Sequence, residues 1–196
     1  MRLSNAEHEG RSWRIREVAP DFRLEDAWAL PAQGGAEDFA TLIELMAALD
    51  PASGESMATR LLFRARHRLG RWFGWDDGAG QLPIPGSSET TLSARLPVDL
   101  RNTATDVDFS STSFTPLYRT DVEWAGELSN RTVHAVMHLA WIDQGAGRYR
   151  AQMGVYVKPR GRGGAGYMAM IAPFRHHVVY PALIRQIGQT WSARAN

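Results

Sequence analysis

FTPLYRTDVEWAGELSNRTVHAVMHLAWIDQGAGRYRAQMGVYV, residues 114–157, is the stretch of sequence that decides the fold. Apolar and polar residues alternate in it over three runs, Phe114–Trp124, Val133–Trp141 and Tyr149–Val157. Alternation with a period of two is typical of strands that bury one face. Two short turns, Ser129–Asn130 and Gln144–Gly147, join the runs. Short turns connect antiparallel neighbours, so the stretch predicts a three-stranded antiparallel meander with one buried face.

A long apolar segment, Tyr167–Trp191, follows the predicted meander. Its apolar residues recur at helical spacing, which predicts a long C-terminal helix. Pro173 and Pro181 each lack a backbone donor and disfavour helix at the preceding residue, so we expect this helix to kink or restart. The glycine-rich stretch Arg160–Gly166, which comes before the helix, is predicted to be a flexible basic loop.

The residues before the meander predict shorter elements. Ser12–Val18 alternates and predicts a strand, and residues 22–30 fit a strand or, nearly as well, a short helix. Apolar stripes at spacings of three and four predict two helices, Glu37–Leu49 and Met57–Phe73. Leu92–Leu100 is a short element whose type the pattern leaves open.

Short helices, a meander and then a long helix make the element order of an α+β fold. We predict a curved antiparallel sheet gripped by the C-terminal helix, the helix-grip arrangement, although other α+β arrangements fit the same order. The chain of 196 residues, 44% of them hydrophobic, is expected to form a single domain. Residues 1–11 are expected to be flexible.

The composition excludes several classes of function. The absence of cysteine rules out disulfides, thiolate metal sites and cysteine nucleophiles. No nucleotide-binding or serine-hydrolase motif occurs, so no cofactor is expected. His134 and His138, four apart on a strand, are about 13 Å apart along it and cannot both bind one metal ion. Without a signal-like apolar run or a long apolar segment, a cytoplasmic location is expected.

Charge is distributed unevenly along the chain. The net charge is only +1, yet residues 144–196 hold eight Arg and Lys side chains and no Asp or Glu. The interpretation we favour is that the acidic residues 1–143 and the basic residues 144–196 pair within one fold or across a homodimer. A basic face that binds an anion, a nucleic acid or a membrane surface is the alternative, although no strong nucleic-acid motif is present.

Four stretches resemble the bacterial family catalogued as domain of unknown function 2867. They are residues 21–31 (DFRLEDAWALP), 127–134 (ELSNRTVH), 155–159 (VYVKP) and 171–181 (IAPFRHHVVYP). The last is the most specific, and the resemblance covers residues 18–192. It implies a relation to the helix-grip superfamily of plant allergens, lipid-transfer domains and aromatic cyclases. It implies no established activity and no catalytic residues.

Seven aromatic or ionisable residues within apolar runs are candidates for binding a ligand. They are Tyr118, Glu123, Trp124, His134, His138, Tyr156 and Arg175. The alternative for the aromatic residues is an ordinary place in the core, and for the histidines it is hydrogen bonds to neighbouring strands or exposure to solvent. A guanidinium on a packing helix needs an anionic partner. For Arg175 this is either a carboxylate of the chain, such as Glu123 or Glu127, or the acid group of a ligand.

Three functions follow as hypotheses. The leading one is a protein that binds a small hydrophobic or weakly acidic molecule in a cavity between the sheet and the C-terminal helix. The second is an enzyme of the cyclase or hydratase type that uses the same cavity, with His134 or His138 as the base and Glu123 as its partner. The third is a non-catalytic protein that assembles into homo-oligomers or binds anions or a membrane surface through its basic face.

Overall fold

The computed structural model describes residues 1–49, 91–104, 107–109, 114–130 and 133–194. The helix predicted over Met57–Phe73 lies outside these residues. The described elements are α1 (Asn5–Glu9), α2 (Ile15–Val18), β1 (Arg23–Gly34), α3 (Asp38–Ala48), the 3₁₀ turns η2 (Leu92–Arg95) and η3 (Val98–Leu100), β2 (Thr115–Arg119), β3 (Glu123–Ser129), β4 (Val133–Asp143), β5 (Tyr149–Pro159), α5 (Gly161–Phe174), the π-helical turn η4 (Arg175–Val179) and α6 (Tyr180–Ala193).

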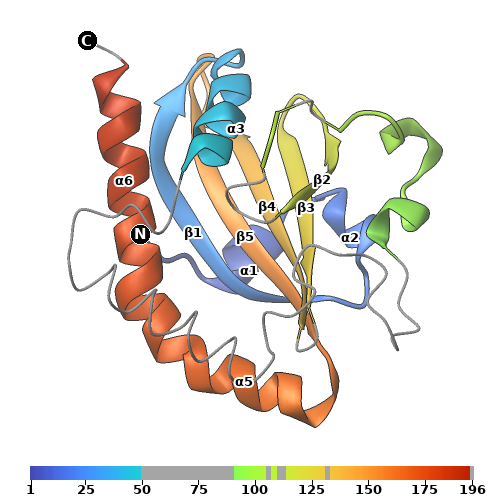
Figure 1. Cartoon of the computed structure of the whole chain (residues 1–196). Helices are drawn as coiled ribbons and strands as arrows, with labels where there is room; N and C mark the ends of the chain where they lie inside the picture. Colours follow the sequence, from blue (N-terminus) through green and yellow to red (C-terminus); the bar gives the residue numbers. More distant parts are fainter. Residues whose placement is uncertain (50–90, 105–106, 110–113, 131–132, 195–196) are drawn as a thin grey trace.

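A curved, five-stranded antiparallel sheet forms the centre of the molecule (Figure 1). Its strand order is β1-β5-β4-β3-β2, so β2 to β5 form the meander and β1 joins at the β5 edge. The meander has one strand more than predicted, because the run 114–124 breaks into β2 and β3. The Oγ1 atom of Thr120 accepts hydrogen bonds from the backbone N–H groups of Val122 and Glu123, and these bonds close the turn. The α+β class, with a long helical C-terminus, is confirmed.

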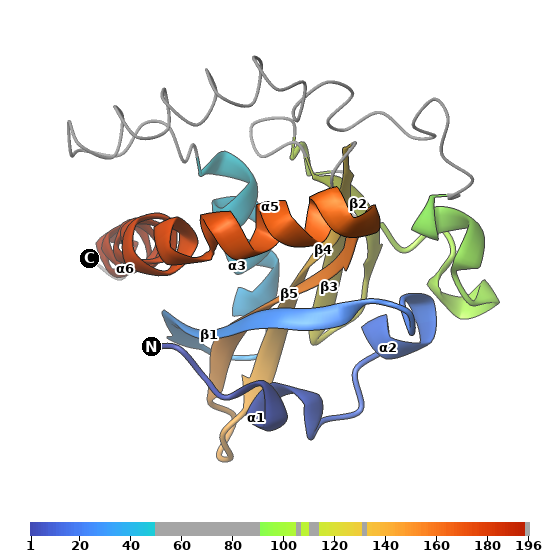
Figure 2. The ribbon, with the colours of Figure 1, turned by 90° about the horizontal axis from the view of Figure 1, so that it is seen from below.

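Both faces of the sheet are covered, so the prediction of a single buried face is wrong. Viewed from below, α3, α5 and α6 lie on one side of the sheet and α1 and α2 on the other (Figure 2). We call these sides the helix face and the N-terminal face. Every residue of β4 from Val133 to Ile142 is buried, with alternate side chains on the two faces. Burial on both sides explains why this strand is apolar at nearly every position.

Helix α3 forms as predicted, within one residue at each end. Its apolar stripe is fully buried on the helix face, where Phe39 stacks on Trp141 with ring centroids 6.1 Å apart. The burial of each such side chain contributes about 1.5–3 kcal/mol to folding. The helix therefore owes its place to tertiary packing more than to its intrinsic propensity.

The N-terminal segment differs from its prediction in two ways. Residues 12–18 do not form a strand, because the buried Ile15 and Val18 are three apart on the short helix α2. Residues 1–11, expected to be flexible, pack against the sheet. The backbone N–H of Leu3 donates to the carbonyl of Ala27 at 2.9 Å, and His8 is fully buried. The strand predicted at residues 22–30 is present as β1 and continues to Gly34.

The C-terminal helix kinks, as its prolines predict. Helix α5 ends at Phe174, the wider turn η4 follows, and α6 begins beside Pro181. The ring of Pro181 would clash with a carbonyl one turn earlier in a regular α-helix, and the wider turn relieves this contact. The predicted loop 160–166 is instead the first turns of α5, since Gly161 turns the chain out of β5 with a φ of 61°. None of the helices in the described ranges has the length and apolar character to cross a membrane.

Candidate functional site

A row of four buried side chains crosses the helix face of the sheet. The strand registers place Trp28 opposite Met153, Met153 opposite Leu139, and Leu139 opposite Trp124. Directly opposed residues of antiparallel strands point to the same face. Three inter-strand steps put the Cα atoms of the two tryptophans about 14 Å apart. The row is thus apolar in the middle and has an indole at each end.

A second row lies beside the first, one pleat along the strands. It consists of Asp26, Val155, Met137 and Gly126. A Cβ atom at Gly126 would lie 2.5 Å from Cη2 of Trp124, so the indole of Trp124 folds across this glycine. The second row therefore begins with a buried carboxylate on β1 and ends under an aromatic ring on β3.

Three buried hydrogen-bond donors on the helix face have no acceptor within the described part of the chain. They are Nε1 of Trp28, Nε1 of Trp124 and Nε of Arg175. Other indoles on this face are paired: Nε1 of Trp141 donates to the carbonyl of Gly35 at 2.8 Å. A buried donor without a partner costs about 1–3 kcal/mol, so three of them on one face call for a physical explanation.

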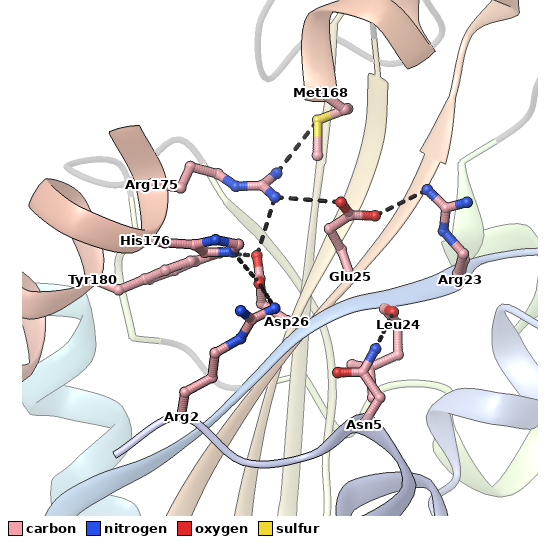
Figure 3. A network of polar contacts seen from close by, with 10 residues as sticks. All are labelled: Arg2, Asn5, Arg23, Leu24, Glu25, Asp26, Met168, Arg175, His176 and Tyr180. Carbon is pink, nitrogen blue, oxygen red and sulfur yellow. Dashed lines mark hydrogen bonds and ion pairs between the residues drawn. The ribbon is translucent and has the colours of Figure 1, made fainter. Parts of the chain in front are cut away.

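Asp26 is the centre of a polar cluster at the β1 end of the second row (Figure 3). Its carboxylate is fully buried and contacts three residues of the helical C-terminus. The Nη2 atom of Arg175 lies 3.2 Å from Oδ2, Nε2 of His176 lies 2.5 Å from Oδ1, and the hydroxyl of Tyr180 donates to Oδ2 at 3.1 Å. Arg2, from the N-terminal segment, lies 3.4 Å from Oδ1.

Local irregularities bring these side chains together. On β1, the register shift between Leu24 and Asp26 leaves Glu25 free to approach Arg175, at 3.4 Å. On the helical side, Arg175 and Tyr180 are five residues apart, a spacing that the wider turn η4 brings onto one side. Burial, followed by the nearby Asp26 carboxylate, raises the pKa of Tyr180, so its hydroxyl stays a donor.

The partner predicted for Arg175 was the wrong carboxylate. An internal ion pair is present, but it is made with Asp26 and Glu25 and not with Glu123 or Glu127. The physical reason is that these two glutamates lie on the N-terminal face, whereas Arg175 lies on the helix face.

A chain of hydrogen bonds crosses the N-terminal face. The Nε2 atom of His138 lies 3.2 Å from Oε2 of Glu123, Nδ1 of His138 lies 3.2 Å from Nε2 of His8, and Nδ1 of His8 lies 3.1 Å from Oε1 of Gln152. Tyr118 also donates to Glu123, at 3.1 Å. Burial opposes ionisation of Glu123, but the hydrogen bonds it accepts outweigh burial, and its pKa lies below the ordinary value.

A second Glu–His pair, Glu127 and His134, lies on the same two strands. It is four residues from Glu123 on β3 and four residues from His138 on β4. The Nε2 atom of His134 is 2.8 Å from Oε2 of Glu127, whose carboxylate also accepts from the backbone N–H of Leu92. In the same way, Glu123 accepts from the backbone N–H of Arg14. Each glutamate thus attaches one covering segment to the sheet, which is a structural role.

The structure separates the seven candidate residues. Five of them, Tyr118, Glu123, His134, His138 and Tyr156, lie on the N-terminal face, and their side chains are buried there. Trp124 and Arg175 lie on the helix face. The prediction that strand histidines share one site with Arg175 beneath the C-terminal helix is therefore wrong. Sequence reasoning missed several residues of these contacts, among them His8, Asp26, Trp28, Gln152, His176 and Tyr180.

Gly154 provides the space that His8 occupies. A Cβ atom at this position would lie 2.7 Å from Nε2 of His8. We expect Gly154→Ala to displace the His8 ring and to lower the free energy of unfolding by about 1–3 kcal/mol, the usual effect of overpacking. Urea denaturation measures this change. Gly166→Ala is the matched control, because nothing lies within 4 Å of its Cβ position, and it should leave stability unchanged or raise it. Equal stabilities for wild type and Gly154→Ala would contradict the packing described here.

The chain matches the model of one known protein family. The model of a family described as "Protein of unknown function (DUF2867)" matches residues 18–182, which include all five strands and the Asp26, Arg175, His176 and Tyr180 cluster. No curated protein and no solved structure was found to match the chain. Because the family model matches most of the chain, the protein belongs to the DUF2867 family.

Proposed function

We propose that the protein binds a small, largely apolar molecule that carries hydrogen-bond acceptors, in the layer between the helix face of the sheet and helices α5 and α6. The set of three buried donors without acceptors, from Trp28, Trp124 and Arg175, is the observation that supports this most strongly. Met153 and Leu139 between the two indoles would provide an apolar floor. A few fixed polar groups in an apolar lining are typical of small-molecule sites.

The chemistry of the unpaired atoms favours one class of ligand. On the helix face of the described chain, the buried side-chain atoms without partners are all N–H donors. A ligand carboxylate or carbonyl would accept hydrogen bonds from them, whereas an ammonium group would not. Arg175 already holds Asp26, so the acceptor would use its remaining Nε–H at the edge of the layer. The ligand is therefore a weakly acidic or carbonyl-containing apolar molecule.

Three finer expectations accompany this proposal. The order of the elements supports placing the chain in the helix-grip superfamily, in which a terminal helix closes a curved sheet. A cytoplasmic location and a homodimer stay predictions. Sedimentation at several salt concentrations would test the dimer, since pairing between acidic and basic parts weakens as salt screens the charges.

Native mass spectrometry of the purified protein is the direct test. A bound molecule would appear as an added mass that denaturing extraction removes. We expect an apolar acid or carbonyl compound in the extract. A protein that is free of any added mass, and that binds no member of a panel of apolar carboxylic acids and ketones, would contradict the proposal.

The two unpaired indoles should control retention of that molecule. We expect Trp28→Phe and Trp124→Phe each to weaken the affinity for that molecule about tenfold and so to lower its occupancy, since a lost hydrogen bond of about 1.5 kcal/mol corresponds to that factor in Kd. Trp191→Phe is the matched control, because its Nε1 donates to the backbone carbonyl of Gln33 at 3.0 Å. Its ligand occupancy should match the wild type. Equal occupancy in all three variants would show that the unpaired indoles do not hold the ligand.

A further inference from the structure

We infer that His176 and Asp26 form a general-base centre at the edge of this ligand layer, in which Nδ1 of His176 accepts a proton and Asp26 is the positioning residue. The inference rests on the proposed function, because the bound molecule would be the substrate. With such a base, the protein would be an enzyme that acts on substrates with an acidic C–H bond next to a carbonyl group.

The contact between the two side chains determines which imidazole nitrogen is the base. Nε2 of His176 lies 2.5 Å from Oδ1 of Asp26. A carboxylate accepts hydrogen bonds, so Nε2 must carry a proton and donate it. In the neutral ring this leaves the lone pair on Nδ1. A buried carboxylate that orients a histidine in this way is the arrangement used by many general bases.

The Nδ1 atom of His176 is open to a substrate. No described residue bonds to it, and the side chain is 22% exposed. His138 differs in both respects, because its two ring nitrogens are bonded to His8 and Glu123 and its side chain is fully buried. His177, the neighbour of His176, is exposed and has none of these contacts among the described residues. Among these histidines, His176 therefore combines an oriented ring with a free nitrogen.

Aromatic contacts connect this base to the proposed ligand layer. The ring of His176 stacks on Tyr180 at a centroid distance of 6.2 Å, and Tyr180 lies 5.0 Å from Trp28. Trp28 is the first member of the apolar row and carries one of the unpaired indole donors. Tyr180 therefore contacts both Trp28 and His176, which lies beside Tyr180 and Asp26 in Figure 3. A ligand that accepts a hydrogen bond from Trp28 would thus be separated from the base by one aromatic side chain.

The arginines of the cluster would stabilise the anionic intermediate of such a reaction. Arg2, Arg23 and Arg175 face two carboxylates, Glu25 and Asp26, so the arginines outnumber the carboxylates by one. Removal of the proton breaks the C–H bond, moves the proton to Nδ1 and shifts the electron pair to the carbonyl oxygen as an enolate. Arg175 would stabilise that oxygen. Return of the proton to a different atom completes an isomerisation that needs no other reactant.

The test uses 5-nitrobenzisoxazole, an apolar compound that reports on bases in apolar sites. Removal of its one acidic ring proton breaks the N–O bond and releases a coloured cyanophenolate, so the proton goes to the base and no co-reactant is needed. We expect the wild type to accelerate this reaction over buffer and His176→Gln to reduce the acceleration at least about a hundredfold, the lower end of the usual range for loss of a general base. His177→Gln is the matched control and should keep the wild-type rate.

Asp26→Asn tests whether Asp26 positions the imidazole of His176. The readout is the tautomer of that ring, which would not change if Asp26 only stabilised the fold. Nitrogen-15 NMR of the imidazole should show the Nε2–H tautomer in the wild type and lose that preference in Asp26→Asn. Circular dichroism establishes that the variant is folded. A mixed tautomer in the wild type, a rate equal to that of buffer, or equal rates for wild type and His176→Gln would each overturn the inference.

Ligand retention separates this inference from the proposed function. If the wild type and His176→Gln both retain the co-purified molecule in native mass spectrometry while the probe shows no acceleration, the base is refuted and ligand binding stands. If no molecule is retained and the probe shows no acceleration, both proposals fall. If acceleration depends on His176, the base is supported whatever the co-purified molecule is.

Discussion

Replacing Glu123 with alanine is expected to lower the free energy of unfolding by about 3–5 kcal/mol, the usual effect of removing one member of a buried ion pair or hydrogen-bonded network. The carboxylate is 4% exposed and accepts from three groups, the backbone N–H of Arg14, the hydroxyl of Tyr118 and the ring of His138. All three groups would lose this acceptor, and the buried Tyr118 hydroxyl and Nε2 of His138 have no other partner among the described residues. Urea denaturation at pH 7 measures the loss.

Asp99→Ala is the matched control for this prediction. Asp99 also holds Arg14, at 2.7 Å, but through the exposed guanidinium. Ion pairs in solvent contribute about 0–1 kcal/mol, so this variant should unfold close to the wild type. If Asp99→Ala and Glu123→Ala lowered stability equally, the attachment of the N-terminal segment would depend on the surface pair and not on the buried carboxylate.

Period-two alternation predicted the meander, and it predicted the wrong exposure of its faces. The polar positions of a strand are exposed when one of its faces is in water, and they are buried when both faces are covered. In β3 and β4 these positions hold Glu123, Glu127, His134 and His138. These side chains are polar in sequence and buried in structure, because the glutamate and histidine of each pair bond to one another and each glutamate also holds a covering segment. Alternation alone therefore cannot tell a solvated face from one that is covered and internally paired.

The candidate site was predicted only in part, because its members come from segments far apart in the chain. Arg175 was identified from its apolar surroundings, and its need for a carboxylate was correct. Asp26 was not identified as that carboxylate, because a single acidic residue in β1 gives no signal before the strand order is known. Adjacent residues on a helix point apart, and the sequence does not tell which of His176 and His177 turns inward; in the structure it is His176, and His177 is exposed.

The N-terminal segment was the largest omission, and its most informative residue is His8. Residues 1–11 show no apolar periodicity that would predict packing against a sheet. The ring is nevertheless fully buried between His138 and Gln152, and Trp13 covers it at a centroid distance of 5.5 Å. A polar residue can thus anchor a segment when the sheet supplies its hydrogen-bond partners, which no local pattern reveals.

The same residue should make the protein sensitive to mild acid. Burial, followed by the neighbouring His138, lowers the pKa of His8 from 6.5 to about 4. Between these values the unfolded chain binds a proton that the folded chain does not, so stability is complete above pH 6.5 and falls as pH falls toward 4. We expect a loss of about 2 kcal/mol at pH 5 and about 3 kcal/mol at pH 4, from 1.36 kcal/mol for each pKa unit.

Urea denaturation from pH 7 to pH 5, with His8→Gln beside the wild type, isolates this effect. Glu123 does not interfere in that range, because its depressed pKa means that its contribution is lost only below its ordinary value of 4.5. Glutamine cannot take up the proton, so the variant should lose about 2 kcal/mol less than the wild type between pH 7 and pH 5. Hydrogen exchange at residues 1–11 should rise in the wild type over the same range, because a protonated His8 would leave its site and take α1 with it. Identical pH dependence in the two proteins would mean that His8 does not hold the N-terminal segment in place.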